Sequence, residues 1–573
     1  MSAGRIGLAP GGGWALLGAV IAMSVAIVGA LLFVILISFY DFGSKLGGLT
    51  LGNYVTLFDD PQFWPAAVNT CWFALVTVSV AALIGTPMAW LVEWTDFPGK
   101  TFVRASLTAV LVIPGYLTAM GWLYLLHPRI GAINIALMEG FGFESAPLPL
   151  NSIFAMGCVE GLLLAPVFFV MTAGSFSQMD ATLEDAAAMS GAGALARMRR
   201  VLLPLMLPGM LAAGITVTMI AFGTFDIPAV IGLSNRLLTF STFVYLKTAR
   251  ADAGLPDYGV PAAFGALMVI AALIGSWTYI RLLQRARQFE VVSGKGYRRR
   301  PVTLKGWVWL AWALVCLYLL LSQVAPFAAV ALQSFQPYPA PLSFASFETM
   351  TLMNYRSAPW ELLWHGAWNS VVIAVVAATL VLMLSVAFAW VVLRSRVPGR
   401  FVFDAIAFMP QAIPRIVFAL GALLFALFAV PDWLPLYGSK SLLIFVYCIA
   451  FISFGSRIIN GSLIQIHPEL EEAAHMSGAG SGTTIRRILV PLLAPVLISA
   501  WVWLAMLCFR ELTLAVLISS SDNITLPVVT WSLWNTGASN RAAAITVMQA
   551  AVLLPLVALF LSLGHRATRL KQL

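Results

Sequence analysis

Residues 184–193 read EDAAAMSGAG, and residues 471–480 read EEAAHMSGAG. The second copy lies 287 residues after the first, and an ungapped alignment of residues 174–208 with 461–495 has 18 identical positions out of 35. Each copy begins with good helix formers and continues into glycines, which favour a tight turn. Because this polar segment recurs between long apolar stretches, the chain is interpreted as a duplication built around it.

The duplication extends over most of the chain. Three further dipeptides recur in the same order: Asn53-Tyr54 as Asn354-Tyr355, Asn69-Thr70 as Asn369-Ser370, and Ala89-Trp90 as Ala389-Trp390. We therefore expect two halves, residues 1–284 and 306–573, joined by a basic linker at 285–305. We call residues 176–204 the first repeat loop and residues 463–491 the second repeat loop. Two repeats of equal orientation predict a pseudo-twofold axis along the membrane normal.

The composition indicates a membrane protein. Apolar residues make up 60% of the chain and charged residues 10%, whereas soluble domains carry about 25% charged residues. So few charges cannot cover a soluble surface, and the fold class expected is an all-α polytopic membrane protein with six spans in each half. The expected spans are 14–39, 66–92, 102–126, 151–174, 205–232, 259–283, 306–333, 366–393, 402–430, 442–464, 492–519 and 542–564. The first is longer than the core of a signal peptide, so we expect it to be retained.

The distribution of lysine and arginine predicts the orientation. If the N-terminus is cytoplasmic, most of the basic residues outside the spans fall on the cytoplasmic side, together with both repeat loops, the linker and the C-terminus. This arrangement accounts for the net charge of +9. The basic linker could bind nucleic acid, but a basic stretch beside a span is more typical of contact with the membrane surface. We therefore expect a lipid bilayer and no nucleic acid as partner.

Metal or disulfide chemistry is not indicated. The five cysteines lie scattered in apolar stretches without a CxxC pair, which favours packing roles. The five histidines show no spacing typical of metal ligands. We expect no metal site, no catalytic residue and no cofactor held by this chain.

The repeat loops resemble the cytoplasmic loop signature of ABC importer permeases, which is Glu-x-Ala-Ala, three residues, Gly, and a later Pro. The residues that carry the pattern are Glu184, Ala186, Ala187, Gly191 and Pro204, and again Glu471, Ala473, Ala474, Gly478 and Pro491. The resemblance implies that each loop docks into an ATPase subunit, whose ATP-driven closure moves the spans.

The residues themselves predict a helix–turn–helix in each repeat loop. We expect the acidic residue to make a charge-assisted contact with the partner, and the second helix to end at the proline. An ordinary amphipathic helix pair on the membrane surface is the alternative.

A closer resemblance is to the fused, twelve-span permeases of ferric-iron ABC importers. It rests on two halves in one chain, on Gly294-Lys295-Gly296-Tyr297, and on Phe509-Arg510-Glu511-Leu512-Thr513. It implies a permease for ferric iron that works by alternating access, with two copies of a cytoplasmic ATPase and a periplasmic binding protein as partners. Permeases for 2-aminoethylphosphonate, thiamine, polyamines or sugar phosphates look similar, so these cargoes remain alternatives.

Charged residues inside the spans are candidates for a substrate pathway, because charges are costly in lipid. These candidates are Asp226, Arg415, Arg510 and Glu511. A structural ion pair is an equal alternative for them. Pro114 and Pro410 are expected to kink matching spans of the two halves.

The chain lacks a GxxxxGK[ST] sequence, so ATP and Mg should be used by a separate subunit. The main rival function is an ion-coupled secondary transporter, to which Asp226 and Glu511 would contribute buried carboxylates. A membrane-embedded enzyme is a third possibility, which the sparse His, Asp and Glu residues of the spans disfavour.

Overall fold

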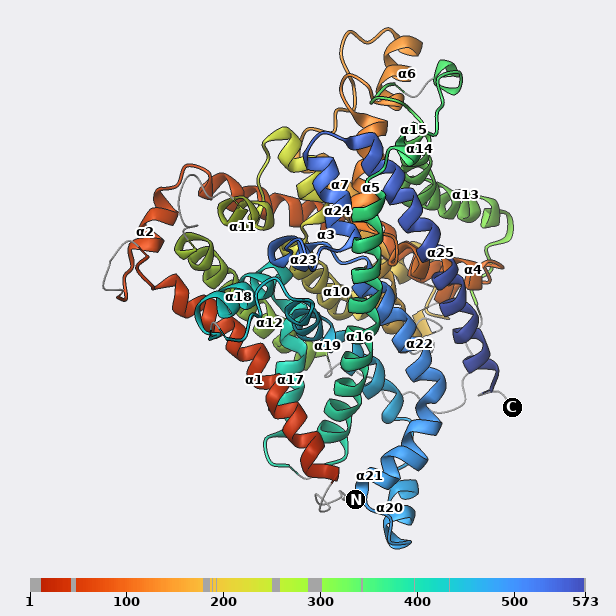
Figure 1. The fold of residues 1–573 in the computed structure, drawn as a ribbon. Helices are drawn as coiled ribbons and strands as arrows, with labels where there is room; N and C mark the ends of the chain where they lie inside the picture. The colour runs from red at the N-terminus through yellow and green to blue at the C-terminus, as the bar shows by residue number, and fades with distance from the viewer. Residues whose placement is uncertain are drawn as a thin grey trace. The chain divides into compact units, whose positions relative to one another are not determined.

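The computed structural model describes residues 12–42, 48–178, 186–187, 189–191, 193–249, 258–286, 301–341, 344–395, 397–431 and 433–570. This part of the chain is helical almost throughout (Figure 1). It also contains the isolated bridges of Tyr40 with Leu49 and of Thr95 with Val302. The predicted all-α class is confirmed.

The number of spans agrees with the sequence. Within the described ranges, 10 helices are long and apolar enough to cross a membrane, and the number rises to 13 if each of three bent helix pairs counts as one span. Ten of the twelve expected spans correspond to the long helices. The other two, 102–126 and 402–430, are bent pairs with angles of 94° and 104°.

The breaks in these two pairs lie at Pro114 and Pro414. Pro114 immediately precedes α5 (Gly115–Leu126), and Pro414 immediately precedes α18 (Arg415–Phe428). A proline disfavours helical geometry in the residue before it, so each helix ends ahead of the Ile-Pro step. The expectation for Pro410 is wrong, because this residue lies inside α17 (Arg400–Ala412).

Two expected spans end earlier than their apolar stretches suggested. The span at 205–232 is α10 (Leu203–Gly223), and a separate bent pair follows at 228–235 and 240–248. The span at 492–519 is α22 (Val490–Phe509), followed by the short α23 (Thr513–Ile518). Polar residues follow the last turn in both cases, so hydrophobicity alone overestimated the length of the helix.

The compact units of the structure do not follow the two sequence halves. One unit contains residues 1–60, 244–269 and 357–573, and the other contains residues 61–243 and 270–356. The opening helix of each half therefore packs with the main body of the other half. The ranges 1–284 and 306–573 are repeats of the sequence, not separately packed bodies.

The first unit is built mainly from the second half. Its helices are α1 (Gly12–Ser38), α2 (Gly52–Asp59), α16 (Trp360–Leu393), α17, α18, α19 (Lys440–Leu463), α20 (Glu469–Met476), α21 (Ser481–Thr484), α22, α23, α24 (Leu526–Asn535) and α25 (Ser539–Leu570). Within this unit, α1 packs against α16, α17 and α18. α11 (Phe240–Ala249) and α12 (Gly259–Ala286) each run from one unit into the other.

The second unit is built mainly from the first half. Its helices are α3 (Phe63–Trp94), α4 (Lys100–Val110), α5, α6 (Ala132–Phe141), α7 (Ile153–Gln178), α9 (Ala194–Arg197), α10, α13 (Val308–Leu319), α14 (Ala325–Ser334) and α15 (Met353–Arg356). α14 packs against α5, and α3, α7 and α10 share a core that contains Phe168 and Val217.

Glycines allow the exchanged helices to approach closely. A Cβ at Gly421 of α18 would lie 2.5 Å from the Ala30 carbonyl oxygen of α1. In the other unit, a Cβ at Gly121 of α5 would overlap the Pro326 carbonyl oxygen of α14. Small residues at crossings are typical of helices packed in membranes, and here they occur at matching places in the two halves.

The segment after each exchanged helix is held by the same hydrogen bonds. Asn53 Nδ2 donates to the carbonyl oxygens of Ser38 (3.0 Å) and Tyr40 (2.8 Å). Asn354 Nδ2 donates to the carbonyl oxygens of Ser334 (2.9 Å) and Gln336 (2.7 Å). The hydroxyl pairs Ser38–Tyr54 (2.8 Å) and Ser334–Tyr355 (2.7 Å) complete the match. The repetition seen in the sequence is thus repeated in three dimensions.

Candidate coupling loops and pathway residues

The second repeat loop is a helix, a turn and a second helix. α20 leads to Gly478, whose φ of +82° lies in the left-handed region that favours glycine. The Ala479 amide donates to the Ala474 carbonyl (3.0 Å), and Ser477 Oγ donates to the Ala473 carbonyl (2.9 Å). These bonds end α20, and Figure 1 shows α20 and α21 beyond the end of α22.

The first repeat loop is described in part and has the same turn. Ala186 and Ala187 are helical, and Ser190 Oγ donates to the Ala186 carbonyl (2.9 Å). Gly191 has a φ of +78°. A Cβ at Gly191 or Gly478 would meet no atom within 4 Å, so the backbone conformation, not lack of space, favours glycine. Glu184 lies outside the described residues.

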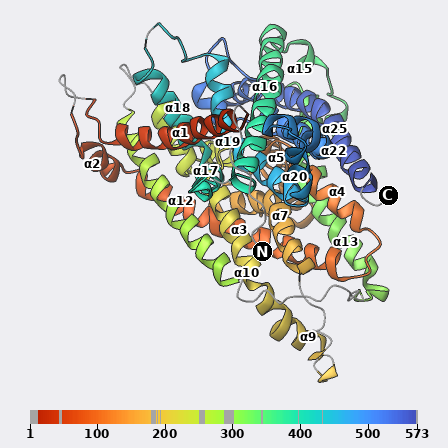
Figure 2. The same ribbon diagram turned by 90° about the horizontal axis from the view of Figure 1, so that it is seen from below.

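The second helix of each loop does not end at the proline as expected. Pro204 and Pro491 lie in the first turn of α10 and α22, where the missing N–H of proline is tolerated. π-helical turns at 198–202 and 485–489 join α9 to α10 and α21 to α22. Each repeat loop therefore continues directly into a span, as α9 and α10 show in Figure 2.

Each loop exposes one large apolar side chain beside its turn. Met189 and Met476 occupy matching positions, and each is 90% exposed. Methionine adapts its shape to irregular apolar partners and is frequent on binding surfaces. The two loops thus offer the same flexible apolar contact at the same place.

Glu471 is not placed as we expected. Its side chain is 1% exposed, and its Oε1 lies 2.9 Å from Nε of Arg394, at the end of α16. Arg394 Nη2 also donates to the carbonyl oxygens of Leu463 (3.0 Å) and Ile466 (2.6 Å). The carboxylate therefore contacts Arg394 within the same unit. A contact of this loop with a partner subunit would have to involve neighbouring exposed residues such as Ala473.

The structure brings two of the four pathway candidates together. Arg415 Nη1 lies 2.6 Å from Glu511 Oε2, and the guanidinium is 5.1 Å from the centroid of the Phe451 ring. The side chain of Glu511 is 5% exposed and that of Arg415 is 30% exposed. Arg510 ends α22 beside this pair.

Asp226 lies in the other unit, against the start of α5. A Cβ at Gly115 would lie 2.8 Å from Asp226 Oδ2. Gly115 follows Pro114 as Arg415 follows Pro414, so the two breaks carry different residues: a glycine beside the Asp226 carboxylate in one half, and an arginine paired with Glu511 in the other.

Sequence reasoning missed Glu160, a carboxylate inside α7. Its side chain is 4% exposed, and its Oε1 accepts a hydrogen bond from Thr224 Oγ1 (2.9 Å). The rule that charged residues inside spans are candidates would have found it, because it lies inside the expected span 151–174. The repeat loops are 287 residues apart, and the same offset from Glu160 leads to Tyr447. The Tyr447 hydroxyl donates to the Glu511 carbonyl oxygen (3.3 Å).

Known proteins resemble this chain in the region that contains the second repeat loop. Residues 381–569 match the family described as "Binding-protein-dependent transport system inner membrane component". The match covers about a third of the chain and, together with the helical fold, supports a permease component of a binding-protein-dependent ABC importer. Such a permease is a multi-pass inner-membrane protein without catalytic activity of its own, and the ATPase is a separate subunit. The family implies two kinds of partner for this permease, an ATPase and a periplasmic binding protein.

Relatives extend the likeness over both halves. The permease is 26% identical over 470 residues to the "Probable ABC transporter permease protein y4fN" of Sinorhizobium fredii, covering 79% of each chain. It is 23% identical to the "Ferric transport system permease protein FbpB" of Actinobacillus pleuropneumoniae, covering 83% of this chain and 69% of that one. It is 25% identical to the "Putative 2-aminoethylphosphonate transport system permease protein PhnU" of Salmonella typhi, covering 44% of this chain and 83% of that one.

Proposed function

We propose that this permease forms the membrane pathway of a ferric-iron importer that works by alternating access. Two ATPase subunits would each hold one repeat loop on the cytoplasmic side, where both termini also lie. A binding protein would deliver the cargo on the other side. ATP binding would draw the loops together and open the pathway outward, and hydrolysis would reset it inward.

The observation that carries the docking proposal is the equality of the two loops. Each has a glycine turn with a left-handed φ, an exposed methionine beside it, and a direct helical continuation into a span. A surface helix pair that binds no partner would not need these three features in both loops. Two equal contacts suit two copies of one subunit.

The docking experiment uses the double variant Met189→Glu/Met476→Glu, co-expressed with the ATPase encoded beside the permease. Because both side chains are 90% exposed, the change should not disturb the fold. We expect the ATPase to stop co-purifying with the permease. Phe141→Glu, at a side chain that is 76% exposed in α6, is the matched control and should leave co-purification unchanged. Normal co-purification of the ATPase with the double variant would contradict docking at these loops.

Gly191→Asp and Gly478→Asp test the same surface through its backbone. An aspartate side chain at a φ near +80° is unfavourable, and it adds a charge at the turn. We expect a permease that still inserts in the membrane but assembles poorly with the ATPase.

The length of the matched region supports ferric iron as the cargo. The relative named for ferric transport matches over most of this chain, whereas the relative named for 2-aminoethylphosphonate matches less than half of it. The second candidate cargo is 2-aminoethylphosphonate, favoured by coverage of 83% of that relative.

Transport by the permease and its ATPase in proteoliposomes distinguishes the candidates. The neighbouring binding protein is added after loading with ferric iron or with 2-aminoethylphosphonate. We expect ATP-dependent uptake of iron and stimulation of the ATPase by the iron-loaded protein. Stimulation by the phosphonate-loaded protein alone would assign the other cargo. Uptake driven by an ion gradient without ATP would instead support the secondary transporter.

A further inference from the structure

The spans that precede the two repeat loops are closed by matching junctions. α3 ends at Trp94, and α16 ends just before Arg394. Thr95 Oγ1 bonds to the Leu91 carbonyl (2.5 Å), and Ser395 Oγ bonds to the Val391 carbonyl (2.6 Å). Each hydroxyl also accepts a hydrogen bond from the amide two residues later. The two hydroxyls therefore make the same two bonds to the backbone in both junctions.

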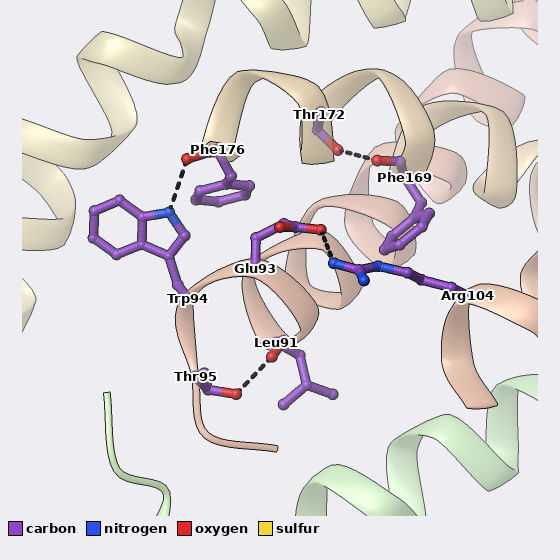
Figure 3. Close-up of polar contacts among 8 residues, drawn as sticks. All are labelled: Leu91, Glu93, Trp94, Thr95, Arg104, Phe169, Thr172 and Phe176. Carbon is purple, nitrogen blue, oxygen red and sulfur yellow. Dashed lines mark hydrogen bonds and ion pairs between the residues drawn. The ribbon is translucent and has the colours of Figure 1, made fainter. Parts of the chain in front are cut away.

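The residue before the hydroxyl is Trp94 in the first half and Arg394 in the second. In the first half, Trp94 Nε1 donates to the Phe176 carbonyl oxygen of α7 (3.2 Å), and its ring packs on the Phe176 ring (Figure 3). In the second half, Arg394 takes the place of Trp94 and donates to Leu463, the counterpart of Phe176. Both side chains thus bind the end of the span that leads into the loop.

Arg394 also contacts the second repeat loop itself. Its Nε pairs with Glu471 of α20, and its Nη2 binds the last carbonyl of α19 and the carbonyl of Ile466 in the connection to α20. A cation is favoured at the carbonyl end of a helix, and a carboxylate in the first turn of the next one. One guanidinium therefore links α16, α19 and α20. Tryptophan, with a single donor and no charge, cannot make these contacts.

The pair is shielded from water. Glu471 is 1% exposed and Arg394 is 11% exposed. A buried ion pair is orientation-specific, because moving one partner leaves the other charge without compensation. The exposed pair Arg104–Glu93 of the first half, with Arg104 54% exposed, has no such constraint.

We propose that Arg394 is a positioning residue that fixes the second repeat loop to α16 and α19, so that movement of the loop is transmitted to this bundle. The proposal rests on docking of the repeat loops to the ATPase. In this proposal the second loop transmits force through the ion pair Arg394–Glu471, and the matching junction of the first half contains Trp94.

The experiment uses the whole complex of permease, ATPase and binding protein in proteoliposomes. Arg394→Trp brings the residue of the first half into the second. We expect the ATPase to co-purify as before, while its stimulation by loaded binding protein and the cargo moved per ATP fall between about 2-fold and about 30-fold. Arg394→Lys, which keeps the charge, should recover part of the loss. Arg104→Ala, which removes the exposed ion pair, is the control and should leave coupling unchanged.

A second variant distinguishes a positioning role of Arg394 from a purely stabilising one. Arg394→Gln/Glu471→Gln removes both charges and leaves no uncompensated charge buried. If the joint positions the loop, coupling stays low in this double variant even when its thermal stability equals that of the wild type. Full coupling in the double variant or in Arg394→Trp would overturn the proposal. Failure of the wild-type ATPase to bind at the loops would instead contradict the proposed docking, so the two failures are distinguishable.

Discussion

Asn53 and Asn354 hold their segments with the same two hydrogen bonds, whereas Gly115 and Arg415, which also match, differ completely. The first pair lies where a helix must turn, and the second lies at the break inside a span. At that break one half has Gly115 beside Asp226, and the other has the ion pair Arg415–Glu511. The two halves therefore share the hydrogen bonds that hold the segment after the opening helix, and they differ in the charged residues at the breaks inside the spans.

The buried carboxylates show the same divergence. In the first half the acid is Glu160 on α7, and its hydroxyl partner Thr224 follows α10. In the second half the acid, Glu511, follows α22, and the hydroxyl of Tyr447 on α19 binds its backbone. Duplication preserved a polar contact between these two elements but exchanged the element that carries the acid.

The largest effect is expected at the helix crossings. Gly421→Leu and Gly121→Leu should both prevent assembly of a folded permease, because even a Cβ would collide with a backbone carbonyl that cannot move aside. The cost should exceed the ~1–3 kcal/mol of ordinary overpacking. Recovery of monodisperse protein in detergent is the measurement. Gly29→Leu, whose Cβ meets nothing within 4 Å, is the control. If only one of the two crossings tolerates leucine, the crossings are not equivalent.

The next effect is expected around the two buried acids, Glu511 and Glu160. Arg415→Ala leaves Glu511 buried without its cation, which should lower the free energy of unfolding by about 3–5 kcal/mol. Glu160→Gln keeps an oxygen acceptor for Thr224, so it should cost only about 1 kcal/mol. Thermal unfolding followed by tryptophan fluorescence checks both. Equal losses of the free energy of unfolding in the two variants would contradict the expected difference between Glu511 and Glu160.

The smallest effects should be equal in the two halves. Asn53→Ala and Asn354→Ala each leave two backbone carbonyls without a donor, which should cost about 1–3 kcal/mol in either half. Tyr54→Phe and Tyr355→Phe remove one hydroxyl contact each and should cost about 0.5–1.5 kcal/mol. The same unfolding measurement applies. A difference of more than about 1 kcal/mol within either pair would contradict the structural match of the two halves.

Much of the site could be predicted from local patterns. The turn of each repeat loop follows from a glycine that recurs at the same place, and Gly191 and Gly478 do take left-handed φ values. The breaks at Pro114 and Pro414 follow from proline chemistry, although the sequence alignment was misread at Pro410. The end of α10 was missed, because apolar residues continue past the point where the helix stops.

Other features could not be predicted because they depend on which helices meet. The partner of Glu471 is far away in sequence, and an acidic residue in a polar loop is more often exposed than buried. Its burial against Arg394 requires the ends of α16 and α19 to lie together. The same holds for the pairing of Arg415 with Glu511.

The sequence alone determined that this chain is a duplicated helical membrane protein with two equal polar loops, because composition, apolar length and repeated spacing are local properties. Only the tertiary structure decided that each opening helix packs with the other half, and that Glu471 of the second loop is buried against Arg394. Those outcomes depend on the close approach of distant backbones, at Gly421 and Gly121, and on which buried charge finds its counter-charge.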